Sequence, residues 1–369
     1  MMKDIYADFG GLSIYDLERI TKDTTLNLYT KIQLLALTKS KDELKELGRS
    51  QYRSLVHQRG STFNPYDTQL IKPNLESMNQ LGLLKPSNDF LVFLPYSWII
   101  QFGFTLAKPY ISRDDEPLYI IDNPVRKDKI FKIPTISSAS WKGNLRWTWM
   151  KTYLETIKDM RDEDFAAERL RQMLLFGSEK GMDEKFSKGW SGYLDNLRPS
   201  AVTQYHHLIG KNFGKDDRLI HFKGRLHFYP TFFNKIDLIV INPHDRKTKT
   251  GKNPIYVECV PAGAQGVFSL LYTPYDLFGK KDASIESEIL IDLHHSCAAI
   301  KEMFLTYGFS AKKNSGFGTS TDSLQDGELL VRYKLNEFFE KKKGMEGIWS
   351  FKFKSLSELA SCISGDTSR

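Results

Sequence analysis

One amphipathic helix stands out in the pattern of hydrophobic and polar positions along the chain. Its hydrophobic residues recur every four positions and are Leu145, Trp149, Tyr153 and Ile157. That spacing places the four side chains on one face of a helix. Several serines precede the run and are suited to cap a helix, so we expect the helix to begin near Ser140.

A second helix and a series of strands follow from the same kind of pattern. A hydrophobic stripe runs from Ala283 to Tyr307, and Gly308 then supplies a residue suited to end a helix. Alternating or short hydrophobic runs predict strands at residues 98–110, 118–121, 219–228, 236–241, 254–260, 267–272 and 328–333. The order strand, helix, strands, helix, strand predicts an α+β fold with a ferredoxin-like βαββαβ core, an antiparallel sheet and large insertions.

The remaining segments suggest how the chain is organised around this core. Residues 1–95 are predicted to form a helical and irregular N-terminal extension, and residues 96–335 to form the core. A charged stretch at about 159–218, with glycines at intervals, is predicted to be an insertion into the core and to be partly helical. Residues 336–369 are assigned to a C-terminal tail.

Composition excludes some classes of protein. The chain has 369 residues, a formal net charge of +7 and 41% hydrophobic residues, which is enough for a substantial core. No apolar run approaches the about 18 residues that span a bilayer, so we expect a cytoplasmic protein with no membrane partner. The three cysteines are far apart, which predicts neither a disulfide framework nor a metal site.

The start of the first predicted helix is basic where acids are favoured. Lys142 and Arg146 are four residues apart, so they share one face, repel each other and oppose the positive end of the helix dipole. A bound phosphate would reverse both effects, and the serines and Gly143 around them complete a cradle for an oxyanion. The alternative is a solvated basic face with Trp141 and Trp147 packed below it.

A second basic segment follows the second predicted helix. It is rich in glycine and runs Lys312, Lys313, Asn314, Ser315, Gly316, Phe317, Gly318. It lacks the spacing of a Walker loop or of a dinucleotide fingerprint. Exposed backbone N–H groups at the glycines, two ammonium groups and an aromatic ring suit a sugar-phosphate backbone with a stacked base. Two such segments indicate an extended polyanion rather than a single metabolite phosphate.

Together the two segments resemble the motifs of the RAMP superfamily, the backbone subunits of type III CRISPR effector complexes. Residues 133–146 are similar to the motif that follows the family's first strand, although the usual glycine after the proline is absent and extra residues intervene. Residues 314–318 are similar to the family's C-terminal glycine-rich loop. The resemblance covers residues 98–335 and is closest to a Cmr-type complex.

The resemblance implies an RNA-binding subunit that grips the guide CRISPR RNA near its 3′ end, for target-RNA recognition in antiviral defence. Its partners would be the guide RNA, the target RNA and other subunits of the effector complex, and RNA binding would need no cofactor. The implied RNA-binding residues are Ser137, Ser138, Ser140, Trp141, Lys142, Gly143, Arg146, Lys312, Lys313, Asn314, Ser315, Gly316, Phe317 and Gly318.

Catalysis is a separate question. In the repeated backbone subunits of the family a loop aspartate supports metal-dependent cleavage, and the candidates here are Asp114 and Asp115, which would need Mg²⁺. Acids in a turn are also commonly just solvated. His244 beside Asp245 forms a possible acid/base pair. The histidine pairs at 206–207 and 294–295 have diverging rings, so we predict no metal site from them.

Two other readings stay open. A ferredoxin-like endoribonuclease that processes the CRISPR precursor RNA would also carry a glycine-rich loop near its C-terminus. An unrelated RNA chaperone or ribosome-associated protein would share the basic segments. The paired placement of the two segments favours the effector-subunit reading over both alternatives.

Overall fold

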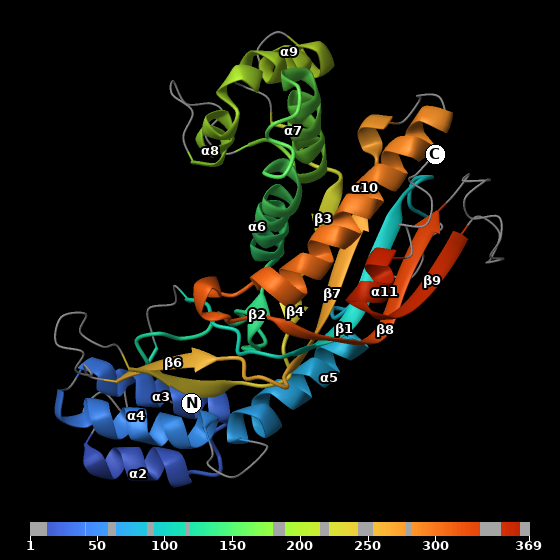
Figure 1. Ribbon diagram of the computed structural model, residues 1–369. Helices are drawn as coiled ribbons and strands as arrows, with labels where there is room; N and C mark the ends of the chain where they lie inside the picture. Colours follow the sequence, from blue (N-terminus) through green and yellow to red (C-terminus); the bar gives the residue numbers. More distant parts are fainter. Residues whose placement is uncertain are drawn as a thin grey trace.

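The structure is a computed structural model, and it describes residues 13–40, 42–57, 64–86, 92–114, 119–179, 189–214, 221–242, 254–277, 282–332 and 348–361. Figure 1 shows a twisted sheet with two long helices over one face. A group of N-terminal helices lies at one end of the molecule, and a helical arm rises at the other.

The main sheet has five antiparallel strands in the order β3-β7-β1-β8-β9. Their bounds are Trp98–Leu106 (β1), Leu226–Phe228 (β3), Gln265–Tyr272 (β7), Ser320–Arg332 (β8) and Ile348–Ser355 (β9). The central strand β1 pairs on one side with β7, where Trp98 lies opposite Tyr272, and on the other side with β8, where Trp98 lies opposite Val331. The two core helices connect these strands in the order β1–α6–β3–β7–α10–β8. The predicted α+β fold with an antiparallel βαββαβ core is therefore confirmed.

The first core helix, α6, spans Ser138–Trp149 and continues as a π-helical turn over Met150–Leu154. Ser137 caps it, because its Oγ accepts a hydrogen bond of 3.2 Å from the backbone N–H of Ser140. The predicted start near Ser140 is confirmed to within two residues.

The second core helix, α10, spans Asp282–Glu302 and continues as a π-helical turn over Met303–Tyr307. Gly308 ends it with φ +73°, and a Cβ there would lie 2.7 Å from the carbonyl oxygen of Phe317. Both the backbone angle and the lack of space require glycine at this position.

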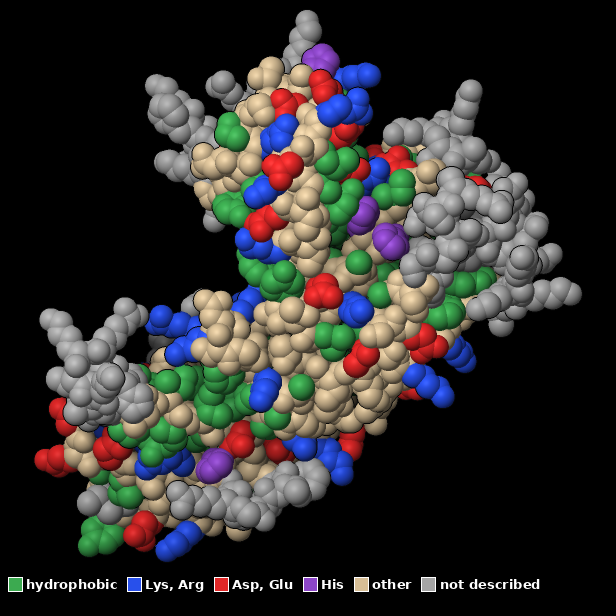
Figure 2. Space-filling view, in the orientation of Figure 1, with side chains coloured by type: hydrophobic (Ala, Val, Ile, Leu, Met, Phe, Trp, Pro, Cys, Tyr) green, Lys and Arg blue, Asp and Glu red, His purple; other side chains and the backbone are tan. Residues whose placement is uncertain are grey.

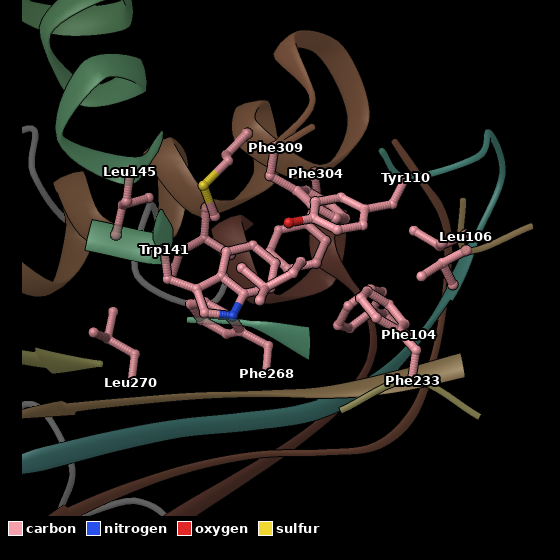
Figure 3. Packing of buried hydrophobic residues seen from close by; sticks show 14 of the residues in the cluster. Phe104, Leu106, Tyr110, Trp141, Leu145, Phe233, Phe268, Leu270, Phe304 and Phe309 are labelled. Atoms are coloured by element: carbon pink, nitrogen blue, oxygen red, sulfur yellow. The ribbon is translucent and has the colours of Figure 1, made fainter. Parts of the chain in front are cut away.

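The core lies between the sheet and these two helices. Alternate residues of β1 point toward the helices and are buried, namely Trp98, Ile100, Phe102, Phe104 and Leu106. Figure 3 shows the aromatic side chains that gather around Trp141 at the start of α6. The indole of Trp141 stacks on Phe304 with 5.4 Å between ring centroids, and its Nε1 donates to Thr231 Oγ1 at 3.0 Å.

The described part of the N-terminal region is helical. Its helices are α2 (Ile14–Lys22), α3 (Leu28–Ala36), α4 (Asp42–Val56) and α5 (Lys72–Gln80). Of these, α4 packs against a separate two-stranded sheet of β5 (Asp237–Ile241) and β6 (Ile255–Cys259). Tyr52 of α4 and Lys127 both bond to the buried carboxylate of Glu258, which joins the extension to this hairpin.

The helical arm is built by residues within the predicted insertion. Its helices are α7 (Asp162–Phe176), α8 (Gly189–Leu197) and α9 (Val202–Phe213). Buried Arg169 pairs inside the arm with Glu179 and Asp195, each at 2.7 Å. Asp292 of α10 accepts from Arg171 of α7 at 2.9 Å and from Arg225 beside β3 at 2.8 Å, which fixes the arm to the core.

Several predicted strands differ from the structure. Tyr119–Ile121 form no strand, because Ile120 and Ile121 are buried in a bend beside α4, where Arg49 Nε donates to the carbonyl of Ile120. The run at 219–228 supplies only β3 in its described part, and β1 ends at Leu106 rather than at residue 110.

The C-terminal region also differs from the prediction. Strand β8 begins at Ser320, eight residues before the predicted start, and residues 348–361 form β9 and α11 (Leu356–Ser361) rather than a tail. Two further short strands, β2 (Thr135–Ile136) and β4 (Thr231–Phe232), pair with each other beside the start of α6. No helix within the described ranges is long and apolar enough to cross a membrane.

Candidate nucleic-acid interface

The outward face of α6 is open at Gly143. The opposite face is buried through Trp141, Leu145 and Trp149, whereas Gly143 is exposed and a Cβ built on it meets no atom within 4 Å. Glycine inside a helix costs about 1 kcal/mol relative to alanine. Since packing in this chain does not require it, the bare backbone at Gly143 is available for close approach by a ligand.

The first turn of α6 presents backbone donors beside this position. Ser137 Oγ lies 2.9 Å from Ser140 Oγ and accepts from the Ser140 N–H, so these two hydroxyls organise the cap. The N–H groups of Ser138 and Ala139 have no acceptor within the described part of the chain. Free donors at the positive end of a helix favour an anion.

Lys142, one residue before Gly143, turns toward the base of the arm, since a Cβ built on Gly177 would lie 3.6 Å from Lys142 Nζ. Burial lowers its pKa first, and the nearby charges of Arg146 and Lys223 lower it further. Lys142 forms no ion pair within the described residues. Since like charges surround this ammonium group, an anion bound here would relieve their repulsion.

Arg146 shares the face of Lys142, as predicted, but its guanidinium turns toward the arm. Its Nη1 donates to the carbonyl of Ser178 at 3.3 Å, and it lies 5.4 Å from the ring centroid of Trp190. Its Nε and Nη2 are buried without an acceptor in the described part of the structure. Burial lowers its pKa, and Glu179 raises it. Arg146 therefore sits at the base of the face with part of its hydrogen-bonding capacity unused.

The glycine-rich segment lies directly beside α6, so the structure brings the two predicted elements together. Asn144 Nδ2 donates to the carbonyl of Phe309 at 3.2 Å, and Lys313 Nζ lies 4.6 Å from the ring centroid of Trp147. Burial lowers the pKa of Lys313. Lys312, Asn314, Ser315 and Gly316 are exposed next to it. Lys142 and Lys313 thus both belong to the surroundings of the open α6 face.

The glycines of this segment act differently from the sequence-based expectation. The N–H of Gly316 donates to the carbonyl of Lys313 and that of Gly318 to the carbonyl of Pro109, each at 2.8 Å. Phe317 packs on the hydrophobic cluster that includes Ile111. These groups hold the segment in shape, so the exposed side chains, rather than the glycine N–H groups, face solvent.

Trp141 belongs to the core and not to the surface. Its side chain is 0% exposed and surrounded by phenylalanines (Figure 3). It leaves no area for contact with RNA, and we therefore exclude it from the interface. Its contribution is to fix the first turn of α6 against the sheet.

The structure adds residues that the sequence analysis did not assign. Lys223, before β3, joins the cations around Lys142. A pocket of about 270 Å³ opens between α6 and α8, lined by Trp147, Met150, Lys151, Gly189, Trp190 and Tyr193. These residues come from two helices some forty positions apart, so no local motif marks them. In Figure 2 the surface is hollowed between the arm and the N-terminal helices, and basic side chains lie along this hollow.

The carboxylate candidates give a mixed result. Asp114 Oδ2 accepts hydrogen bonds from the backbone N–H of Lys127 and from the Tyr119 hydroxyl, both at 3.1 Å, so this oxygen organises the surrounding loop. Asp115, like His244 and Asp245, lies outside the described residues. Within the described ranges, no three His, Cys, Asp or Glu side chains are grouped to hold a metal ion.

The described histidine pairs lie on helices. His294 and His295 are on α10, and burial lowers the pKa of His295 to about 4, which keeps its ring neutral beside Tyr153. His206 and His207 are on α9 in the arm. We assign no chemistry to either pair.

Comparison with known proteins identifies one family. The family model described as the RAMP superfamily matches residues 60–319, which extends the match into the N-terminal extension. No curated protein matches the chain. Among solved structures, a chain of the type III-B Cmr-beta complex bound to cognate target RNA is 13% identical, with a TM-score of 0.40, and the alignment covers 86% of this chain and 99% of that one.

Two further solved structures are similar at the same level. The Csm3-Csm4 subcomplex of the type III-A CRISPR-Cas interference complex contains a chain that is 14% identical with a TM-score of 0.34, covering 75% of this chain and 100% of that one. A chain of a CRISPR RNA-guided surveillance complex, pre-nicking, is 14% identical with a TM-score of 0.39, covering 64% of this chain and 77% of that one.

Proposed function

Since this chain belongs to the RAMP superfamily, we propose that it is an RNA-binding subunit of a type III CRISPR ribonucleoprotein. It grips the phosphate backbone of the guide CRISPR RNA on the open face of α6, near the 3′ end of the guide. Its partners are the target RNA and neighbouring subunits of the effector complex, and it serves target-RNA recognition in antiviral defence.

The observation that carries the proposal is the bare backbone at Gly143 among cations. Lys142 and Lys313 have no carboxylate partner within the described residues, and they come from the two segments that the sequence analysis singled out. A phosphate backbone that passes the start of α6 would accept from the free N–H groups of the first turn and then run past Gly143, about one helical turn further along. Arg and Lys side chains with helix N-termini are common partners of phosphate oxygens.

The proposal assigns RNA binding alone to this chain. Asp114 already uses one carboxylate oxygen to hold its own loop, and no further group within the described residues completes a site for cleavage around it. A variant Asp114→Ala is therefore expected to keep guide binding.

Gly143→Ala tests the proposal, because the substitution has opposite expected effects on stability and on binding. The added Cβ meets nothing in the protein, so the helix gains about 1 kcal/mol in free energy of unfolding. The same Cβ intrudes where the phosphate approaches, so RNA affinity is expected to fall about tenfold. Urea unfolding and fluorescence anisotropy with a labelled single-stranded RNA measure the two quantities.

Gly210→Ala is a matched control for this test. Gly210 lies in α9, and a Cβ built there also meets no atom within 4 Å. This variant is expected to gain stability to a similar extent and to keep the RNA affinity of the unmodified chain. Equal affinity for Gly143→Ala, Gly210→Ala and the unmodified chain would contradict the assignment of the α6 face.

The identity of the RNA is tested on the intact complex. A tag on this chain allows the assembly to be purified from its native host, and its RNA to be extracted and sequenced. Short CRISPR-derived RNAs, with contacts crosslinked to this chain near their 3′ ends, are expected. Recovery of unprocessed precursor, or of RNA unrelated to CRISPR loci, would support one of the two alternatives instead.

A further inference from the structure

A pocket lined by aromatic side chains lies next to the proposed phosphate site. We propose that the pocket between α6 and α8, defined by Trp147, Met150, Lys151, Gly189, Trp190 and Tyr193, receives one unstacked nucleobase of the bound RNA. This inference rests on the proposed function, since the base belongs to the strand whose backbone lies on α6.

Three large aromatic rings line this pocket, and two of them, Trp147 and Trp190, pack against the edge of the main core. Trp147 and Trp190 are half-buried, and the side chain of Tyr193 is 42% exposed. Rings of this size left at the surface present flat apolar faces to solvent. Every nucleobase has a π-face, so such rings bind unpaired bases by stacking.

The rings are held in place by hydrogen bonds at the pocket's edge. Trp190 Nε1 donates to Gln172 Oε1 at 3.3 Å. The Tyr193 hydroxyl and Lys151 Nζ both bond to the carboxylate of Glu155. Side chains fixed in this way lose little freedom when a ligand arrives, which favours binding.

Cations border the pocket and distinguish it from a purely apolar groove. Lys313 lies 4.6 Å and Lys151 5.9 Å from the ring centroid of Trp147, and Arg146 lies 5.4 Å from that of Trp190. Of these three, only Lys151 pairs with a carboxylate, that of Glu155, among the residues that the structure describes. The resulting positive charge suits the phosphates on either side of an inserted base.

Size limits what can enter. The pocket volume of about 270 Å³ lies below the roughly 300–1,000 Å³ of pockets for drug-sized ligands. A single planar ring system fits this volume better than a longer segment of a partner protein.

The position along α6 connects the pocket to the phosphate site. Gly143 and Trp147 are four residues apart, which is about 6 Å along the helix. A backbone phosphate at Gly143 would therefore be followed within a nucleotide or two by a base at Trp147. The α6 face and the pocket can thus act on one continuous stretch of single-stranded RNA.

The experiment combines protein variants with abasic RNA. The full chain, Trp147→Ala and Tyr193→Ala are each titrated with a short single-stranded RNA of mixed sequence and with copies that carry one abasic nucleotide at each position in turn. Each alanine variant is expected to lose about 5- to 100-fold in affinity for the intact RNA. Removing the base at one position should weaken binding to the unmodified chain but weaken binding to Trp147→Ala no further.

Tyr256→Ala is the matched control. Tyr256 lies on β6, is 38% exposed, and lies under Arg53 at 4.6 Å, much as Tyr193 lies near Lys151 at 5.6 Å. This variant is expected to bind the intact RNA as the unmodified chain does. Circular dichroism and urea unfolding of each variant, together with Trp147→Phe, which keeps a ring in the pocket, separate loss of binding from loss of folding.

The outcomes distinguish this inference from the proposed function. If Gly143→Ala weakens binding while Trp147→Ala and Tyr193→Ala bind all RNAs as the unmodified chain does, the base pocket is refuted and the RNA-binding role stands. If these two variants instead lose a neighbouring subunit on purification of the complex, the pocket holds protein and the inference is also refuted. If the unmodified chain binds no RNA, alone or in the complex, the proposed function itself fails.

Discussion

Two pairs of basic side chains in this protein lie in contrasting environments. Arg169 and Arg225 are buried, and each is surrounded by carboxylates, with Arg225 pairing with Asp276, Glu288 and Asp292. Lys142 and Lys313 lie at the α6 face and have no carboxylate partner within the described residues. Both pairs are partly or wholly desolvated, yet among the described residues only the first pair has its charge compensated by carboxylates.

The difference separates cations that join elements of the fold from those that we propose bind RNA. A buried cation with a full set of carboxylates joins elements, here the arm, α10 and β3, and has no charge left for a ligand. A cation that lies among like charges raises the local potential, and its compensation must come from outside. The state of pairing therefore tells which basic residues to test for RNA binding.

The largest effect is expected when a structural cation is removed. Arg225→Met leaves the buried Asp292 without its main partner and removes the partner of the partly exposed Asp276 and Glu288, and the free energy of unfolding is expected to fall by about 3–5 kcal/mol. Urea unfolding followed by circular dichroism measures this loss. The RNA affinity of the folded fraction should stay within twofold of that of the unmodified chain. A large loss of affinity in the folded fraction would contradict the assignment of Arg225 to a structural role.

A smaller effect is expected at a buried acid without a counter-ion. Asp67 accepts from the Ile236 N–H at 2.9 Å but forms no salt bridge within the described residues, and burial raises its pKa to about 6. The folded chain therefore keeps this proton between pH 4 and 6 where the unfolded chain has lost it. The contribution of protonated Asp67 to the free energy of unfolding is therefore full below pH 4, and it is lost as the pH rises through 6.

Asp67→Asn removes this dependence. As the pH rises from 4 to 7, the free energy of unfolding of the variant is expected to increase relative to that of the unmodified chain. The increase is up to about 3 kcal/mol for a shift of about two pKa units. Unfolding free energies measured in urea at several pH values provide the test. A difference between the two proteins that is constant over this range would mean that Asp67 is charged in the folded chain.

The smallest effect on stability, with a clear effect on binding, is expected at Lys142. Lys142→Gln removes one phosphate contact, so RNA affinity should fall about tenfold and the slope of log affinity against log salt should decrease by about 0.7. Stability should change by less than about 0.5 kcal/mol. The exposed Lys211 of α9 provides the control, since Lys211→Gln should leave both the affinity and the slope unchanged.

The helices and the order of the core could be predicted from the sequence because their patterns are local. The period of four at Leu145 and Trp149, and Gly308 at the end of α10, depend only on neighbouring residues. The apolar residues Ile120 and Ile121 show the limit of this reasoning. They satisfy a strand pattern, but their burial is supplied by α4, which is distant in the sequence.

The candidate site divides in the same way. The basic start of α6 and the glycine-rich segment could be recognised because each is a short motif. The roles of individual residues within them could not be predicted. In the sequence, Trp141 and Phe317 both look like aromatic residues of a binding motif, and only tertiary packing shows that both face inward. The pocket at Trp147 and Trp190 could not be predicted from the sequence either, because only tertiary packing brings these residues together.

The burial of Trp141 also has a consequence for how this protein can change over time. Its indole is locked between Phe304, Phe268 and Thr231, and Gly143 is only two residues away on the same helix. The position of the open α6 face is thus set by packing in the core and does not depend on the identity of the exposed side chains. If α6 binds RNA as proposed, its surface residues are free to diversify with each new RNA, while the register at which they meet it stays constant.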